Sequence, residues 1–137
     1  MAVDRVQRRI AAILAADVVG YSRLTEKDET GTLAALRQHR EGIIEPLAAQ
    51  HQGRIVKSMG DGVLVEDPSA VNAVGCAIDL QQDMATANAA LPVDRRIVVR
   101  IGINLGDVIV AAGGLHGDVV IVASRLEQLA EPGCVYV

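Results

Sequence analysis

The chain has 137 residues and a mass of 14.4 kDa, which fits one compact domain that is large enough to bury a core. Half of its residues are hydrophobic and 22% are charged, so we expect neither a disordered nor a fibrous protein. It has no Trp or Phe, only two Tyr and a net charge of -4, which leaves little for base stacking or phosphate contacts, and we expect no nucleic-acid partner.

The first third of the chain predicts a buried strand followed by a long helix. Residues 1–8 form a basic N-terminal tail, and the apolar run at residues 9–19 is typical of a central strand that is buried on both faces. Thr25 with Asp28 is a helix start signal, and apolar residues recur at helical spacing as far as Leu47. Pro46 lacks an N–H group, so we expect it to kink or divide this helix.

A hairpin and a second helix are predicted next. Residues 54–66 contain two short β-rich runs separated by Gly-Asp-Gly, and we expect this sequence to supply the positive φ angles of a tight turn. A helix then extends to about residue 90, with its predicted apolar face formed by Val71, Val74, Ile78 and Met84.

The last third of the chain contains the sequence that most clearly predicts a strand. Isoleucine and valine occupy every second position from Ile97 to Ile103, with Arg100 and Asn104 on the opposite side. We expect a turn at residues 105–107, a second strand that ends at Gly113 and Gly114, a helix over residues 120–130 and a final strand from Gly133.

This order of elements predicts the fold class. The order β-α-β-β-α-β followed by β-α-β is that of an α+β domain, with a ferredoxin-like split β-α-β sheet that is mainly antiparallel and covered by helices. The domain is expected to occupy residues 9–137. Because the chain stops inside an apolar strand, we also expect the domain to lack its last strands here and to continue beyond Val137.

The cysteines and the apolar runs indicate in which cellular compartment the protein is expected. Cys76 and Cys134 are far apart in sequence and form no C-x-x-C motif, so neither a disulfide framework nor a zinc site is expected. The longest apolar run, residues 10–16, is too short for a membrane span. We therefore expect a cytoplasmic domain with no membrane segment.

Two aspartates stand out by position. Asp17 interrupts the first apolar strand, and Asp61 lies in the hairpin whose strands are expected to pair beside it. Two carboxylates on neighbouring strands can hold Mg²⁺, which takes its remaining ligands from water and substrate phosphates. The alternatives are structural, with Asp17 capping the next helix and Asp61 serving only the turn.

Three further features have a functional and a structural interpretation. Lys57 is either a solvated strand residue or a hydrogen-bond donor to a base or phosphate. Arg125 is either a surface arginine, paired with Glu131 or with solvent, or the residue that binds the charge of a reacting phosphate. The turn after Asp17 offers backbone N–H groups and a hydroxyl that can receive phosphate oxygens. Its residues are Val18, Val19, Gly20, Tyr21 and Ser22.

Four ordered motifs carry a resemblance to a known family. They are AAILAADVVGYSRL, GRIVKSMGDGVLVE, RIGINLGDVIV and VASRLEQLAEPG, and they span nearly the whole chain from residue 9. Together they resemble the catalytic domain of class III adenylate and guanylate cyclases. The resemblance implies formation of cyclic AMP and pyrophosphate from ATP, by attack of the ribose 3′-oxygen on the α-phosphate, in intracellular signalling.

The resemblance also implies roles for individual residues. Asp17 and Asp61 match the aspartates that bind two Mg²⁺ or Mn²⁺ ions, and the turn of residues 18–22 matches the segment that holds the triphosphate. Lys57 matches the lysine that selects the purine, and Arg125 matches the catalytic arginine that stabilises the transition state. In that family two domains pair head to tail, so a homodimer with sites shared between its subunits is expected.

Two positions depart from the family pattern. Gly114 stands where a second purine-reading residue is expected, and Ile121 stands where an asparagine orients the ribose. An isoleucine cannot donate that hydrogen bond, so slow turnover is expected. The alternatives are a degenerate cyclase homology domain that keeps dimerisation or nucleotide binding without appreciable catalysis, and a ferredoxin-like module that binds another ligand.

Overall fold

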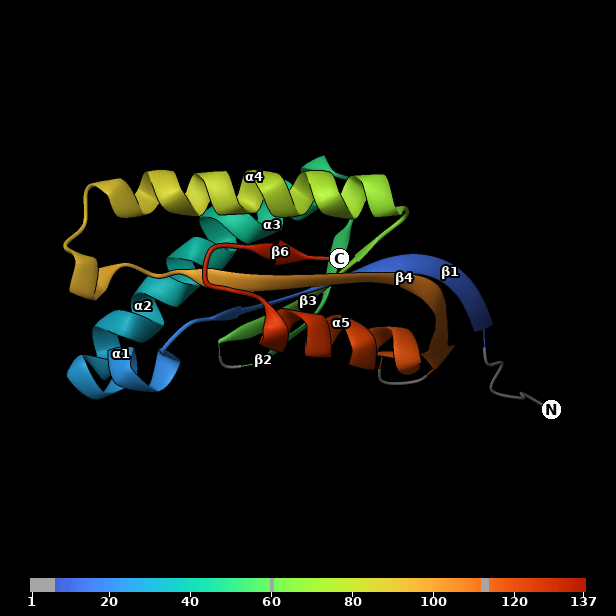
Figure 1. The fold of residues 1–137 in the computed structure, drawn as a ribbon, viewed down its shortest axis with the longest axis horizontal. Coiled ribbons are helices and arrows are strands. Elements are labelled where there is room, and N and C mark those ends of the chain that lie inside the picture. Colours follow the sequence, from blue (N-terminus) through green and yellow to red (C-terminus); the bar gives the residue numbers. More distant parts are fainter. Residues whose placement is uncertain (1–6, 60, 112–113) are drawn as a thin grey trace.

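The structure is a computed structural model that describes residues 7–59, 61–111 and 114–137. Figure 1 shows one sheet with helices on both sides. In chain order the elements are β1 (Gln7–Val18), α1 (Tyr21–Lys27), α2 (Glu29–His39), the π-helical turn η1 (Arg40–Ile44), α3 (Glu45–Gln50), β2 (Arg54–Met59), β3 (Gly62–Asp67), α4 (Ala70–Ala89), the 3₁₀ turn η2 (Val93–Arg95), β4 (Val99–Ala111), β5 (Gly114–His116), α5 (Asp118–Leu129) and β6 (Val135–Tyr136).

Strand β1 is the centre of the sheet. The strand order is β2-β3-β1-β4-β5, and β6 pairs with β4 in parallel while the other pairs are antiparallel. Every residue from 11 to 16 is buried, which confirms the prediction of a strand that is covered on both faces. The predicted α+β class and the mainly antiparallel, ferredoxin-like sheet are also confirmed.

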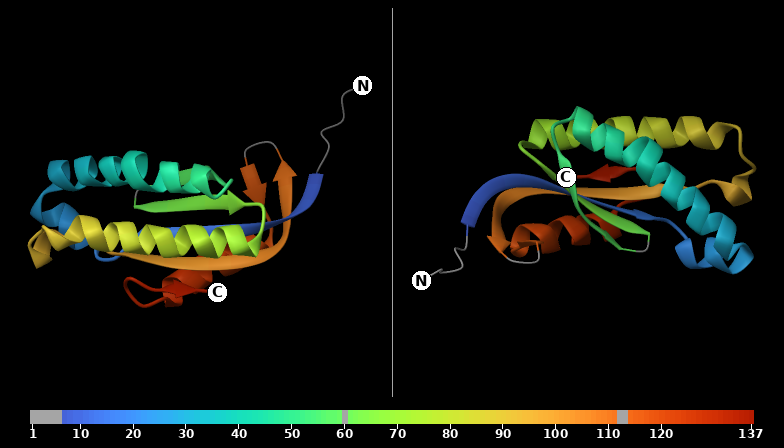
Figure 2. Two further views of the ribbon diagram at one scale, coloured as in Figure 1. Left: turned by 90° about the horizontal axis from the view of Figure 1, so that it is seen from above. Right: turned by 180° about the vertical axis from the view of Figure 1, so that it is seen from behind.

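The alternation of side chains along β1 divides the core in two. Even-numbered residues 12–18 belong to a large cluster with residues of α3 and α4, whereas odd-numbered residues 11–15 pack with Val119 and Ala123 of α5. Figure 1 shows α4 and α5 on opposite sides of the sheet, and Figure 2 shows α1 to α3 running together across the face that α4 also covers. A residue at position 17 therefore belongs to the α5 face.

Strand β4 is longer than predicted, and the turn expected at residues 105–107 is wrong. β4 runs without interruption from Val99 to Ala111, and Gly106 within it pairs with Ala11. The reason is the length of β1, which pairs with β4 along all twelve of its residues. The predicted alternation is confirmed, since Ile101 and Ile103 face the large core cluster.

The first helical region begins earlier than predicted. Tyr21 starts α1, and the Thr25 hydroxyl donates to the Tyr21 carbonyl inside that helix instead of capping a new one. Asp28 is the capping residue, because its side chain accepts from the Gly31 N–H at the start of α2. Pro46 lies in the first turn of α3 and does not divide the helix, because the backbone stays helical from residue 29 to residue 50; only the hydrogen-bond pattern changes, in the π-helical turn η1 that precedes α3.

The buried face of α4 differs from the predicted one. Val71 and Ile78 are exposed, whereas Ala77 and Leu80 are buried together with Met84. Helical spacing was correct, and Val74 and Met84 of the predicted face pack against the core, but the helix is turned so that the small residues Ala73, Cys76 and Ala77 are buried as well. Small side chains let α4 approach the sheet closely.

The N-terminal strand begins earlier than predicted. β1 begins at Gln7, so Gln7 and Arg8 belong to the strand and not to the predicted tail. The Arg9 guanidinium makes two hydrogen bonds of 2.8 Å to Glu66. Residues 1–6 lie outside the described residues.

Cys76 and Cys134 are both free, as predicted. Within the described ranges, none of the helices has the length and apolar character to cross a membrane.

A glycine lets α5 lie directly against the sheet. Gly102 of β4 is buried, and a Cβ atom at this position would clash with the backbone of Ala123 and Glu127 in α5. These are backbone atoms that cannot rotate away as a side chain can. The position of α5 therefore depends on the absence of a side chain at residue 102.

We predict that Gly102→Ala lowers the free energy of unfolding by about 1–3 kcal/mol or more, because overpacking against backbone forces α5 away from β4. Urea unfolding measures the loss. Gly42→Ala is the matched control, since a Cβ there meets no atom within 4 Å, and its stability should be unchanged or slightly higher. Equal stability of the two variants would contradict the close approach.

A second buried feature is the carboxyl group of Asp67 at the end of β3. It is 0% exposed, and neither carboxylate oxygen has a hydrogen-bond partner among the described residues. Burial is the main cause that raises the pKa of Asp67 from 3.8 to about 6. Its folded-state pKa thus exceeds its unfolded value, so the protonated form stabilises the fold and stability is lost as the pH rises through about 6.

We predict that Asp67→Asn removes this pH dependence. Relative to the variant, the wild-type chain should lose up to about 3 kcal/mol of unfolding free energy between pH 4 and pH 7, at about 1.4 kcal/mol per pKa unit. Urea unfolding at several pH values tests this, with the exposed Asp83→Asn as control. Parallel stability curves for wild type and Asp67→Asn would show that the Asp67 carboxyl group has an ordinary pKa.

Candidate active site

Asp17 and Asp61 meet at one end of the sheet. Asp17 is the second-to-last residue of β1 and lies opposite Gly62, the first residue of β3. Asp61 directly precedes Gly62 in the hairpin turn, so antiparallel pairing brings the two aspartates together. Gly62 itself does not have the positive φ that the sequence suggested, and Gly60 lies outside the described residues.

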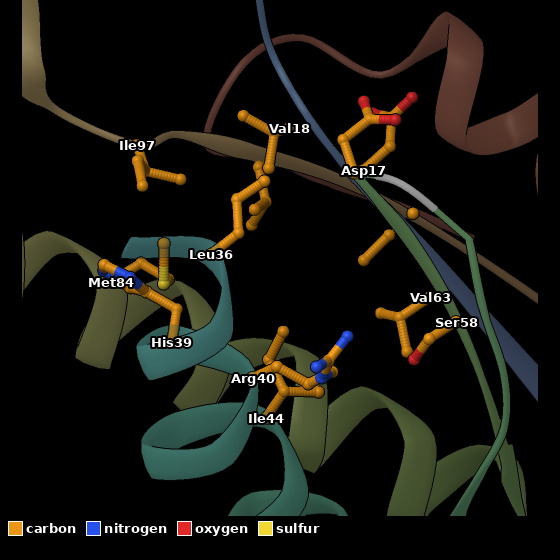
Figure 3. A pocket seen from close by; sticks show the side chains of 14 residues that line it. Asp17, Val18, Leu36, His39, Arg40, Ile44, Ser58, Val63, Met84 and Ile97 are labelled. Carbon is orange, nitrogen blue, oxygen red and sulfur yellow. The ribbon is translucent and has the colours of Figure 1, made fainter. Parts of the chain in front are cut away.

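Both aspartates line two cavities on opposite faces of the sheet. The larger cavity, of about 230 Å³, lies on the α5 face and is also lined by Lys57, Ser124 and Glu127. The smaller one, of about 50 Å³, lies between the sheet and the helices on the other face. Figure 3 shows that apolar side chains with His39 and Arg40 surround the smaller cavity, while the Asp17 side chain points away from it. The carboxylate of Asp17 therefore belongs to the larger cavity.

Asp17 is held by an arginine that the sequence did not single out as functional. Arg100 lies directly opposite Asp17 on β4. Its Nε donates to Asp17 Oδ1 at 3.2 Å and its Nη2 donates to Asp17 Oδ2 at 3.1 Å. Hydrogen bonding to Asp17 is the largest cause that raises the pKa of Arg100. The strand register was the missing signal, since the sequence shows only that Arg100 is on the polar side of its strand.

Glu127 of α5 completes a charged group with Asp17 and Arg100. Glu127 is only 5% exposed, and its Oε1 lies 3.5 Å from Arg100 Nη2 without a hydrogen-bond partner among the described residues. Burial raises the pKa of Glu127 to about 8, with Asp17 adding to the increase and Arg100 opposing it. Sequence reasoning missed this residue, because a glutamate on a helix is usually solvated.

The two basic residues predicted from the sequence lie in different places. Lys57 is exposed on the edge strand β2 and lines the same cavity as Asp17 and Asp61. Arg125 is exposed on α5 and is not among the residues that line this cavity. The structure therefore brings Lys57, but not Arg125, to the aspartates of its own chain.

The predicted phosphate-binding turn joins β1 to α1. Val18 is buried at the end of β1, and the Val19 N–H donates to the Val98 carbonyl. Gly20 has a left-handed φ of 69°, which favours glycine. A Cβ on Gly20 would lie 3.3 Å from Nη2 of Arg23, so a guanidinium covers the turn. Tyr21 and Ser22 begin α1, with Ser22 exposed.

The two positions that depart from the family pattern flank the start of α5. Gly114 in β5 has φ of 130°, so any other residue there would be strained although a Cβ would meet no atom within 4 Å. Ile121 is 50% exposed on α5. An apolar side chain at this surface position gains little from the core and donates no hydrogen bond.

The described residues fit a metal only in part. Asp17 and Asp61 supply the hard carboxylate oxygens that Mg²⁺ and Mn²⁺ prefer, and they border one cavity. No group of three or more His, Cys, Asp or Glu residues suited to a metal is found in the described part of the chain. A cation here would take its remaining ligands from water and from phosphate, as Mg²⁺ commonly does.

Comparisons with known proteins agree on one family. Residues 4–137 match the family profile of the Adenylate and Guanylate cyclase catalytic domain. The chain is 58% identical over 133 residues to Putative adenylate cyclase 3 of Rhizobium meliloti (strain 1021), covering 97% of this chain and 23% of that protein. It is 35% identical to an adenylate cyclase of Streptomyces coelicolor, covering 98% and 33%.

Solved structures of cyclases are also similar to this chain. A cyclase structure from Silicibacter pomeroyi, described as Adenylate/Guanylate Cyclase/Hydrolase, is 45% identical with a TM-score of 0.89, covering 96% of this chain and 76% of that one. The adenylyl cyclase CyaB from P. aeruginosa is 25% identical with a TM-score of 0.81, covering 96% and 77%. The chain spans a third or less of the length of the two curated relatives, from Rhizobium meliloti and Streptomyces coelicolor.

Proposed function

Because the chain belongs to the adenylate and guanylate cyclase catalytic domain family, we propose that it converts ATP into cyclic AMP and pyrophosphate as a class III nucleotide cyclase domain. The observation that carries this proposal is the meeting of Asp17 and Asp61 at one cavity, because two carboxylates at the ends of neighbouring strands suit a triphosphate bound with divalent cations. Such a domain acts in signalling in the cytoplasm, where nucleoside triphosphates are abundant.

The cations in this proposal are two Mg²⁺ or Mn²⁺ ions held by Asp17 and Asp61. When bound, they neutralise phosphate charge and favour attack of the ribose 3′-oxygen on the α-phosphorus, from which pyrophosphate leaves. The aspartates are supported in this role by their oxygen chemistry and by the larger cavity on the α5 face, which both of them line. The turn of residues 18–22 lies next to the same end of β1, and in this proposal it contacts the triphosphate through N–H groups other than that of Val19, which donates to Val98.

The basic residues give the proposed site its specificity and its transition-state contact. Lys57 selects the purine in this proposal, and its exposed position on an edge strand leaves it accessible to a base. Arg125 is the catalytic residue that stabilises the charge on the reacting phosphate, for which a guanidinium with several donors is suited. Base and phosphate are therefore bound by different elements.

We further propose that two copies of the chain build the site together. Arg125 is exposed and does not line the aspartate cavity of its own chain, so it is free to serve the cavity of a partner. Ile121 and Leu129 are also exposed on α5, at 50% and 71%. Exposed apolar residues beside a catalytic arginine favour contact with another protein surface.

A degenerate domain is the alternative function. The conformation of Gly114, which disfavours every other residue, and the apolar Ile121 at a surface position support it. Such a domain would bind nucleotide or dimerise without appreciable turnover. The two functions differ in a single measurement, the formation of cyclic nucleotide.

We predict that the chain forms cyclic AMP from ATP with Mn²⁺ at protein concentrations that favour dimers, and that GTP is used less well. Asp17→Asn should lower the rate at least about a hundredfold, which is about 2.7 kcal/mol of transition-state stabilisation. Asp83→Asn, an exposed aspartate on α4, is the control and should retain the wild-type rate. Nucleotide binding without any cyclic product from the wild-type chain would favour the degenerate domain instead.

We predict that an inactive Asp17→Asn chain and an inactive Arg125→Ala chain complement each other. In an equal mixture half of the dimers are mixed, and each has one intact site, so about a quarter of the wild-type activity should return. A mixture of Asp17→Asn with Asp61→Asn is the control, because both changes damage the same contribution and neither site is repaired. Absence of recovery in dimers that have demonstrably mixed would show that each chain holds a complete site.

A further inference from the structure

We propose that Arg100 competes with the divalent cation for Asp17, and that Glu127 holds the Arg100 guanidinium once the cation has displaced it. This inference rests on the proposed role of Asp17 as a cation ligand. It makes Arg100 and Glu127 positioning residues, which control when the carboxylate of Asp17 is available.

The geometry at Asp17 shows what a cation has to displace. Both oxygens of its carboxylate accept a hydrogen bond from Arg100, at 3.2 Å from Nε and 3.1 Å from Nη2. This two-point contact is the strongest arrangement that an arginine makes with a carboxylate. A cation that binds Asp17 takes at least one of these oxygens and places a second positive charge beside the guanidinium. Cation and guanidinium therefore compete for the same group.

Glu127 offers a second position for the Arg100 guanidinium. Oε1 of Glu127 lies 3.5 Å from the same Nη2 atom that now donates to Asp17, and it has no hydrogen-bond partner among the described residues. Nη1 of Arg100 already donates to the Gln128 carbonyl on the same helix at 3.2 Å. A small movement of the guanidinium toward α5 thus exchanges one hydrogen-bond acceptor for another, Oε1 of Glu127, without returning the guanidinium to water.

The charges around Arg100 determine the balance between its two positions. Asp17 and Glu127 are the two carboxylates within 4 Å of Arg100 in the described ranges, and Asp61 acts electrostatically on both Arg100 and Glu127. The negative charges of Asp17 and Asp61, which border the same cavity, repel each other when no cation is present. Arg100 stabilises this arrangement without a cation, and it raises the cation concentration at which Asp17 is loaded.

Titration with Mn²⁺ alone, followed by the electron paramagnetic resonance of free Mn²⁺, tests the competition on the full chain without any assay of activity. Arg100→Lys keeps the positive charge but not the two-point contact, so it should bind Mn²⁺ at least threefold more tightly than wild type. Arg100→Gln should bind more tightly still. Arg8→Gln removes an equal charge from an exposed position at the other end of β1 and should change the affinity less than twofold.

A double-mutant cycle tests the role of Glu127. Glu127→Gln should weaken Mn²⁺ binding at least threefold in the wild-type chain but less in the Arg100→Gln chain, which has no guanidinium to hold. If Glu127 acts only through its charge, the two effects are equal. Glu131→Gln is the control for an exposed glutamate near the same helix and should have little effect in either background.

Arginine ¹⁵Nε NMR of the wild-type chain with Mg²⁺ provides a measurement that depends on no variant. The Arg100 resonance should shift with the same midpoint as cation binding, and an unchanged resonance at saturation would overturn the proposal. So would equal Mn²⁺ affinities for wild type and Arg100→Lys. If Asp17→Asn still abolishes binding in those cases, the proposed cation site stands and only the competition is wrong. If neither wild type nor Arg100→Gln binds Mn²⁺, both proposals are wrong.

Discussion

The antiparallel pairing of β1 with β3 on one side and β4 on the other is the constraint on which the site depends. This register places Asp17 opposite Gly62 on one neighbour and opposite Arg100 on the other. A shift by one residue would turn Asp17 into the core between the sheet and α4, because side chains alternate between the two faces. The apolar residues 11–16 are buried on both faces and keep this register fixed. The packing of the core therefore decides which charges meet.

The position of α5 depends on the same pairing. Gly102 of β4 lies opposite Ala15 of β1, and two small residues side by side leave room for the helix backbone. The close approach buries Glu127 beside Arg100, where a more distant helix would leave it in water. The burial of Glu127 on α5 therefore depends on the small residues Ala15 and Gly102 in the sheet. Fold stability and the electrostatics of the site are coupled through it.

Several elements could be predicted from the sequence because their signals are local. The unbroken apolar run of β1 and the alternation in β4 each depend on a few neighbouring residues, and both predictions were correct. The turn expected at residues 105–107 was wrong because Gly106 is held in β4 by its partner strand. The buried face of α4 was wrong in part because packing on the sheet decides how the helix is turned. Both errors concern contacts between segments that are distant in sequence.

The sequence by itself determined the family, the fold class and the candidate residues Asp17, Asp61, Lys57 and Arg125, since motifs and periodicity are written in the order of residues. It also located the aspartates next to each other, because a strand and a hairpin of this order pair in few ways. Only the tertiary structure decided that Arg100 covers both oxygens of Asp17 and that Glu127 is buried without a hydrogen-bond partner for Oε1. These residues are 83 and 110 positions from Asp17 along the chain. Their contact depends on register and on helix packing, which no local pattern encodes.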